Sequence, residues 1–161
     1  MISINFDGLQ TFEKSLEGFA EDVAKKGDKL CEELAELGRE VADVRFRDAV
    51  YSGVNDVDVQ AEKTDDGYYV IAEGTSVLFI EYGTGINTAP HTIPVYERGG
   101  YGQGKGKNKA WVYNGRQGNN GIPLGKGRVL TYGDPANECM YSAAEEMRDN
   151  VTRIAKEVFE K

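Results

Sequence analysis

Apolar residues in the first third of the chain recur at steps of three and four positions. The series has one gap, around residues 26–27, and consists of Leu9, Phe12, Leu16, Phe19, Val23, Leu30, Leu34, Leu37, Val41 and Val44. This spacing predicts one amphipathic helix, in which Gly18 and Gly27 are weak points for a bend or a break. A continuous helix of about 40 residues would be about 60 Å long, longer than a domain of this size. We therefore expect the helix either to kink or to find apolar cover on another subunit.

The period changes after residue 54. Residues 57–61 alternate between apolar and polar, and residues 68–72 are rich in strand-forming side chains, which predicts two strands. Between them, Asp65-Asp66-Gly67 predicts a hairpin turn, because glycine tolerates the positive φ that such turns need. The apolar run Val77–Tyr82 fits either a buried strand or a short helix. Further strands are expected at residues 111–113 and 128–132.

A second amphipathic helix is predicted at the end of the chain. Asp134 is a suitable N-cap, and Pro135 fits the first helical position, where its missing N–H costs nothing. One face is then apolar at Met140, Ala144, Met147, Val151, Ile154 and Val158, and we expect it to pack on the sheet. The order helix, strands, helix predicts a single α+β domain over residues 1–161 with a small, mainly antiparallel sheet.

Composition narrows the class of protein. The chain has 161 residues, 40% hydrophobic residues and a formal net charge of −8, which argues against generic binding to nucleic acid or anionic membranes. Its apolar runs are far shorter than a membrane span, and its first residues do not resemble a signal peptide. Two cysteines, Cys31 and Cys139, do not form a disulfide framework, so an intracellular protein is expected. Both read as small core or interface residues in helices.

Glycine and positive charge are concentrated in one segment. Ten of the twenty glycines lie in residues 99–127. Residues 98–128 contain no acid and seven bases: Arg98, Lys105, Lys107, Lys109, Arg116, Lys126 and Arg128. Because few of these residues are apolar, we expect most of this loop insertion to be mobile until it meets a partner. With Trp111 inside it, the segment suits contact with an acidic protein surface or a DNA backbone; a plain solvated loop is the alternative.

Candidate chemistry is sparse. The stretch from Gly99 to Lys105 matches the start of a phosphate-binding loop, but Gly106 stands where Ser or Thr should follow. Glu81, among apolar neighbours, could be a general acid in a small hydrolase with His91. Alternatively, its carboxylate accepts hydrogen bonds from the N–H groups of the turn at residues 83–85. We expect no enzymatic activity, and neither a cofactor nor a metal site is predicted.

Two motifs carry a resemblance to a known family. The stretch Phe79-Ile80-Glu81-Tyr82-Gly83-Thr84-Gly85, with Pro90-His91 after it, resembles the F-[VI]-E-[FY]-G-T-G motif of the tail-completion, or head–tail joining, proteins of long non-contractile-tailed bacteriophages. Residues 133–141 resemble the start of that family's last helix, through Pro135, Asn137, Met140 and Tyr141. The sequence departs from the family at Glu138-Cys139, where Pro-Phe is usual.

The resemblance implies a structural protein of the virion rather than an enzyme. Such a protein, encoded by a phage or prophage, is present in the host cytoplasm during assembly and then in the neck of the particle. It forms a homo-oligomeric ring between the head-completion protein and the tail tube or its terminator, with DNA passing through and no membrane contact. We expect the first helix to carry much of the subunit contact and residues 98–128 to order on assembly. The alternative is an intracellular, dimeric binding or regulatory module of phage or bacterial origin.

Overall fold

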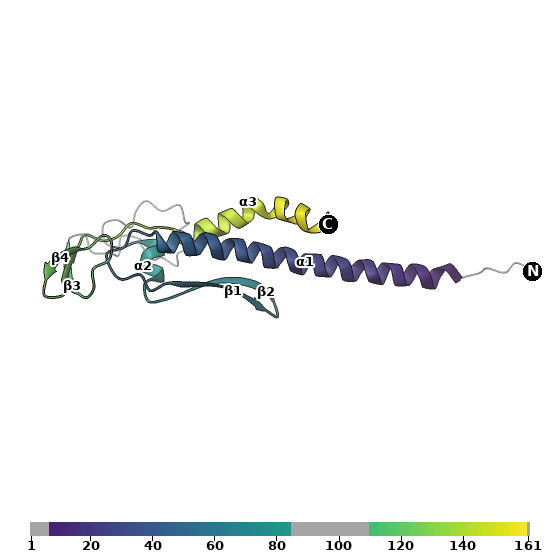
Figure 1. The fold of residues 1–161 in the computed structure, drawn as a ribbon, viewed down its shortest axis with the longest axis horizontal. Helices are drawn as coiled ribbons and strands as arrows, with labels where there is room; N and C mark the ends of the chain where they lie inside the picture. The colour runs from purple at the N-terminus through teal and green to yellow at the C-terminus, as the bar shows by residue number, and fades with distance from the viewer. Residues whose placement is uncertain (1–6, 85–109, 161) are drawn as a thin grey trace, which may run out of the picture.

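The computed structural model describes residues 7–84 and 110–160 and has an α+β fold. The elements in chain order are α1 (Asp7–Arg47), β1 (Asp58–Thr64), β2 (Gly67–Glu73), α2 (Val77–Tyr82), β3 (Trp111–Asn114), β4 (Ile122–Gly125), β5 (Arg128–Thr131) and α3 (Cys139–Phe159). The helix α1 lies between α3 on one side and the β1–β2 hairpin on the other, and strands β3 and β4 lie beyond its C-terminal end (Figure 1).

The first helix is continuous over 41 residues. It passes through Gly18 and Gly27 without interruption, so the expected alternative of a kink or break at these glycines is wrong. A Cβ atom at either glycine would have no neighbour within 4 Å, which indicates that neither serves a close packing contact. The second alternative, apolar cover on another subunit, stays a prediction.

The predicted hairpin is confirmed. Strands β1 and β2 pair antiparallel from Asp58–Glu73 to Thr64–Gly67, with the turn at residues 65–66. The hairpin lies along α1, and near its tip Lys63 forms an ion pair with Asp28 at 2.7 Å. The end of α3 reaches the same level of α1, where the Lys26 ammonium donates to the Phe159 carbonyl at 3.4 Å. Among the residues that the structure describes, the cover of α1 by the rest of the chain therefore ends near residue 26.

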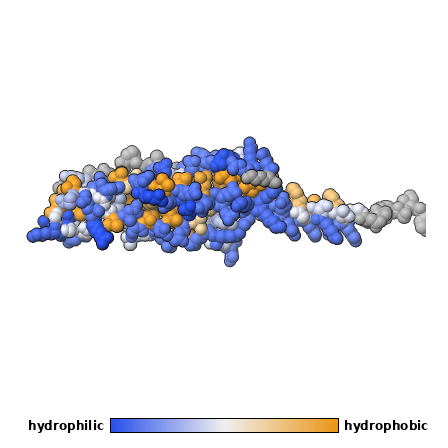
Figure 2. All heavy atoms as spheres, viewed as in Figure 1, coloured by the Kyte–Doolittle hydropathy of each residue, from blue (hydrophilic) through white to orange (hydrophobic). Residues whose placement is uncertain are grey.

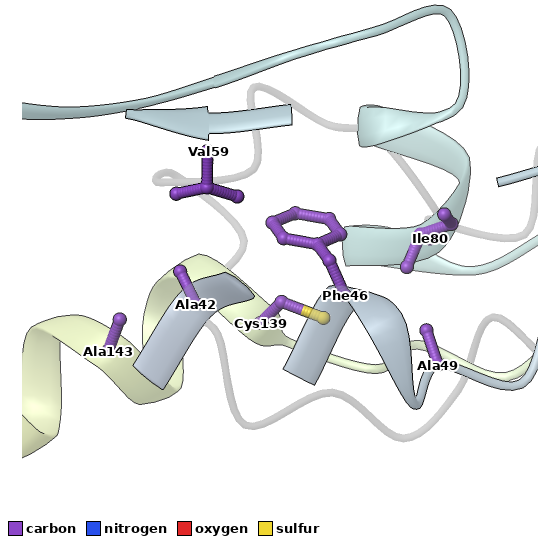
Figure 3. Packing of buried hydrophobic residues seen from close by; sticks show 7 residues of the cluster. All are labelled: Ala42, Phe46, Ala49, Val59, Ile80, Cys139 and Ala143. Atoms are coloured by element: carbon purple, nitrogen blue, oxygen red, sulfur yellow. The ribbon is translucent and has the colours of Figure 1, made fainter. Parts of the chain in front are cut away.

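The core lies where the C-terminal half of α1 meets the hairpin, α2 and the start of α3. Phe46 is packed among Val59 of β1, Ile80 of α2 and Cys139 of α3 (Figure 3). The cluster is completed by small residues: Ala42, Ala49 and Ala143. Phe46 is the largest fully buried side chain of this cluster. Cys139 is a core residue as predicted, whereas Cys31 is exposed in this chain.

The remaining strands form a second sheet rather than extending the hairpin. The run Val77–Tyr82, for which the sequence leaves both a buried strand and a short helix open, forms a short helix. Strands β3 and β5 occur where strands were predicted, but β4 falls inside the segment expected to be mobile. The strand order is β3-β5-β4, all antiparallel. The expectation that residues 98–128 order only on assembly is therefore wrong for residues 110–128; residues 98–109 lie outside the described residues.

Two predictions about the last helix need correction. It begins at Cys139 rather than at Pro135, because Asp134 is buried and its carboxylate binds side chains of other segments instead of capping a helix. It also packs mainly on α1 and not on a sheet. The two helices and the hairpin meet closely at Gly38, where a Cβ atom would lie 2.5 Å from Met147 Sδ and 3.1 Å from Val70 Cγ2.

The contact at Gly38 can be tested against a second glycine of the same helix. Gly38→Leu forces a side chain between α1, α3 and the hairpin, and we expect it to lower the free energy of unfolding by about 1–3 kcal/mol. Gly18→Leu places the same side chain in open space and, because leucine has the higher helix propensity, should leave that free energy unchanged or raise it by up to about 1 kcal/mol. Urea denaturation of both variants measures the difference; equal effects would contradict the packing described here.

Candidate functional site

The two segments that carry the family resemblance form one joint in the structure. The backbone N–H of Asn137 donates to the Ile80 carbonyl at 2.9 Å, and the backbone N–H of Glu138 donates to the Glu81 carbonyl at 3.2 Å. The Thr84 N–H donates to the Asp134 carbonyl at 2.8 Å. Residues about 55 apart in the sequence are thus hydrogen-bonded through their backbones, and this joint fixes the start of α3 against the end of α2.

Glu81 caps the last helix. Its two carboxylate oxygens accept hydrogen bonds from the backbone N–H groups of Met140 at 2.9 Å and Tyr141 at 3.1 Å. These are N–H groups of the first helical turn, which have no partner within the helix. Burial raises the pKa of Glu81, while the N–H donors of α3 oppose that shift. The carboxylate of Glu81 thus accepts hydrogen bonds from backbone N–H groups, as the non-catalytic alternative predicts. The donors belong to α3 and not to the turn at residues 83–85.

Asn137 holds the joint to the end of α1. Its side-chain oxygen accepts from the Val50 N–H at 2.9 Å, and its amide group donates to the Val50 carbonyl at 3.2 Å. On the other edge of the same extended segment, Asn119 accepts from Tyr51 N–H and donates to the Ala49 carbonyl, both at 2.7 Å. Two asparagine side chains thus pair with both edges of the chain leaving α1, as neighbouring strands would.

The glycine of the turn motif is required by space and conformation. Gly83 has a φ of +71°, and a Cβ atom there would lie 2.7 Å from both the Ala136 nitrogen and the Asp134 carbonyl oxygen. Beneath it, the buried Asp134 carboxylate accepts from the Ser52 hydroxyl at 2.7 Å and the Asn120 amide at 3.2 Å. The close backbone contact at this junction therefore requires glycine at position 83.

The ionisable groups of the junction are buried or bound to backbone N–H groups. Both oxygens of Glu81 are engaged by the helix, and burial together with Glu81 raises the pKa of the Cys139 thiol to about 12. Gly85 and His91 lie outside the described residues. A small pocket of about 180 Å³ beside the junction is lined mainly by aromatic and hydroxyl side chains, including Phe79, Trp111 and Tyr113. Among residues 7–84 and 110–160, no group of three His, Cys, Asp or Glu could hold a metal ion.

The predicted basic residues are only partly placed. Arg98, Lys105, Lys107 and Lys109 lie outside the described residues. Arg116, Lys126 and Arg128 are exposed around the three-stranded sheet, at the end of the molecule opposite the N-terminus of α1 (Figure 1). Trp111 is half-buried on the face of β3 that turns toward the body. The described cations thus surround an ordered sheet instead of extending along a mobile loop.

The most exposed apolar surface is on the projecting part of α1. We call residues 8–25 the arm; every one of them is exposed, and at about 1.5 Å per residue they form about 27 Å of helix beyond the ends of α3 and the hairpin. The arm carries an apolar stripe whose members are 41–67% exposed: Leu9, Phe12, Leu16, Phe19 and Val23. Figure 2 shows apolar side chains along one side of this projection and hydrophilic ones along the other. Exposed aromatic and aliphatic side chains in a contiguous row indicate an interaction surface.

Comparisons with known proteins returned no match: neither a family model, nor a curated protein, nor a solved structure resembles this chain closely enough to be identified. Within the described part of the chain, no helix is both long and apolar enough to cross a membrane.

The capping role of Glu81 has a direct test. Glu81→Gln keeps the size of the side chain but turns one of its two acceptor oxygens into an N–H donor that faces a backbone N–H. We expect the free energy of unfolding to fall by about 1–3 kcal/mol. The matched control is Glu145→Gln in the same helix, which removes an exposed ion pair with Arg148 and should cost less than about 1 kcal/mol. Equal effects in chemical denaturation would show that Glu81 is not a cap.

Proposed function

We propose that this chain is a structural subunit of the head–tail neck of a long non-contractile-tailed bacteriophage or prophage. In this role it assembles as a ring between the head-completion protein and the tail tube or its terminator. The family assignment rests on the resemblance of residues 79–85 and 133–141. The observation that carries the assembly role is the arm, because an isolated protein gains nothing from projecting five large apolar side chains into water.

The rest of the described chain supports an assembly role over a catalytic one. The residues of the two motifs are engaged with one another: Glu81 holds the start of α3, and Asn137 holds the exit of α1. This network joins the segment after α1 to the end of α2 and the start of α3, while α1 itself packs along α3 and the hairpin. A rigid body with a protruding helix suits a subunit whose neighbours complete it.

The exposed basic residues support a passing contact with DNA or with an acidic neighbour. Arg116, Lys126 and Arg128 lie around a sheet that has no acidic residue between positions 110 and 132. In a ring, such a surface would face either the next protein of the neck or the channel. Deleting residues 99–127 to test this idea would also remove β3 and β4, so substitution of the three cations is the cleaner change.

Assembly is tested with the arm itself. Phe12→Ser combined with Phe19→Ser should leave the free energy of unfolding within about 0.5 kcal/mol per substitution, because both rings are exposed. Light scattering over a concentration series should show wild-type chain forming a particle of fixed stoichiometry once the adjacent head and tail proteins are added. The double variant should fail to form it. Tyr69→Ser, which removes an exposed ring from the hairpin, is the matched control and should assemble normally.

Two results would contradict the proposal. A tight dimer that is independent of concentration and indifferent to the neck proteins would favour the dimeric regulatory module. Normal assembly of the arm variant would show that the apolar stripe is not a subunit contact.

A further inference from the structure

We infer that the arm of one copy of this chain packs on the three-stranded sheet of the next copy, in a head-to-tail contact between opposite ends of the molecule. The inference deepens the proposed function, since it assumes that copies assemble, and it names the two surfaces that meet. Its basis is that each end carries an uncovered apolar surface and that the two surfaces have opposite charge.

The sheet has an apolar row on its outer face. Val112 of β3 and Ile122 of β4 both pair with Leu130 of β5, so the three side chains lie side by side across the sheet. Val112 and Ile122 are each 48% exposed, while the alternate face holds the buried Val129. A sheet with one face packed on the body leaves its other face to water or to a partner, and an apolar row favours a partner.

The two surfaces carry complementary charge. The sheet region, residues 110–132, has three basic residues and no acid, and Arg128 shares the outer face because it lies two positions from Leu130. The arm has four acids and two lysines. Acidic and basic rims around apolar centres steer association and fix orientation.

The charges of the arm are also arranged around the stripe. Glu13 is three positions from Leu16, and Asp22, which forms an ion pair with Lys26 at 3.4 Å, is three positions from Phe19, so both acids flank the stripe. Lys14 and Lys25 each lie two positions from a stripe residue, about 200° around the helix. The face that would enter the contact is therefore acidic at its rim, with both lysines pointing away from it.

This arrangement disfavours pairing of two arms. Arm–arm contact would bring two acidic rims together and would leave the apolar row of the sheet uncovered. Arm–sheet contact covers both surfaces with one type of interface. Because the two surfaces differ and lie at opposite ends (Figure 1), the contact is heterologous, the type that generates a ring when the rotation between copies closes.

Cross-linking distinguishes the two arrangements. The single variants Leu16→Cys and Ile122→Cys are made in a Cys31→Ser background; the remaining Cys139 is buried. Under conditions that give assembled particles, a short bismaleimide should link an equimolar mixture at least about tenfold faster than either variant alone, since contact raises the effective concentration of the thiols. Leu16→Cys mixed with Glu62→Cys, an exposed position on the hairpin, is the control and should not cross-link.

Three outcomes would overturn the inference. Rapid cross-linking of Leu16→Cys alone would show arm–arm pairing. Assembled particles without a preferential link between residues 16 and 122 would show that the arm meets another surface, while the proposed function would stand. Absence of any assembly, with or without the neck proteins, would overturn the inference and the proposed function together.

Discussion

The structure depends on a mismatch of lengths between α1 and the elements that cover it. The helix spans 41 residues. The end of α3 and the tip of the hairpin reach along it only as far as its residues 26–28. A helix of an ordinary globular protein draws most of its stability from the apolar face that it buries. Among the described residues, the C-terminal half of α1 meets this requirement within the chain and the arm does not, which is why we propose that another copy of the chain covers the arm.

A polar joint lies at the other end of α1, where it holds the segment that follows the helix. Asn119 and Asn137 hold the two edges of residues 49–51, and Glu81 holds the first turn of α3. Because these bonds connect segments distant in sequence, the exit of α1, the end of α2 and the start of α3 are fixed as one unit. A projecting helix can serve as a specific contact only when its base is fixed in this way.

Much of the fold follows from local patterns, and the exceptions have physical reasons. The stripe, the hairpin turn at Gly67 and strands β3 and β5 are visible in the sequence because each depends on spacing or turn chemistry over a few residues. Asp134 misleads because its local signal is that of an N-cap, yet the tertiary structure uses its carboxylate to satisfy Ser52 and Asn120. The cap comes instead from Glu81, nearly sixty residues earlier, which no local rule could identify. Strand β4 was obscured by glycine and proline, whose strand propensity is low.

Hydrogen–deuterium exchange of the arm amides tests the central claim most directly. If the arm lacks cover within its own chain, the amides of residues 8–25 should exchange rapidly in dilute protein, while those of residues 30–46, flanked by α3 and the hairpin, should be protected. On assembly the arm amides should become protected as well. Strong protection of the arm in a dilute monomer, or unchanged rapid exchange in the assembled particle, would contradict the account.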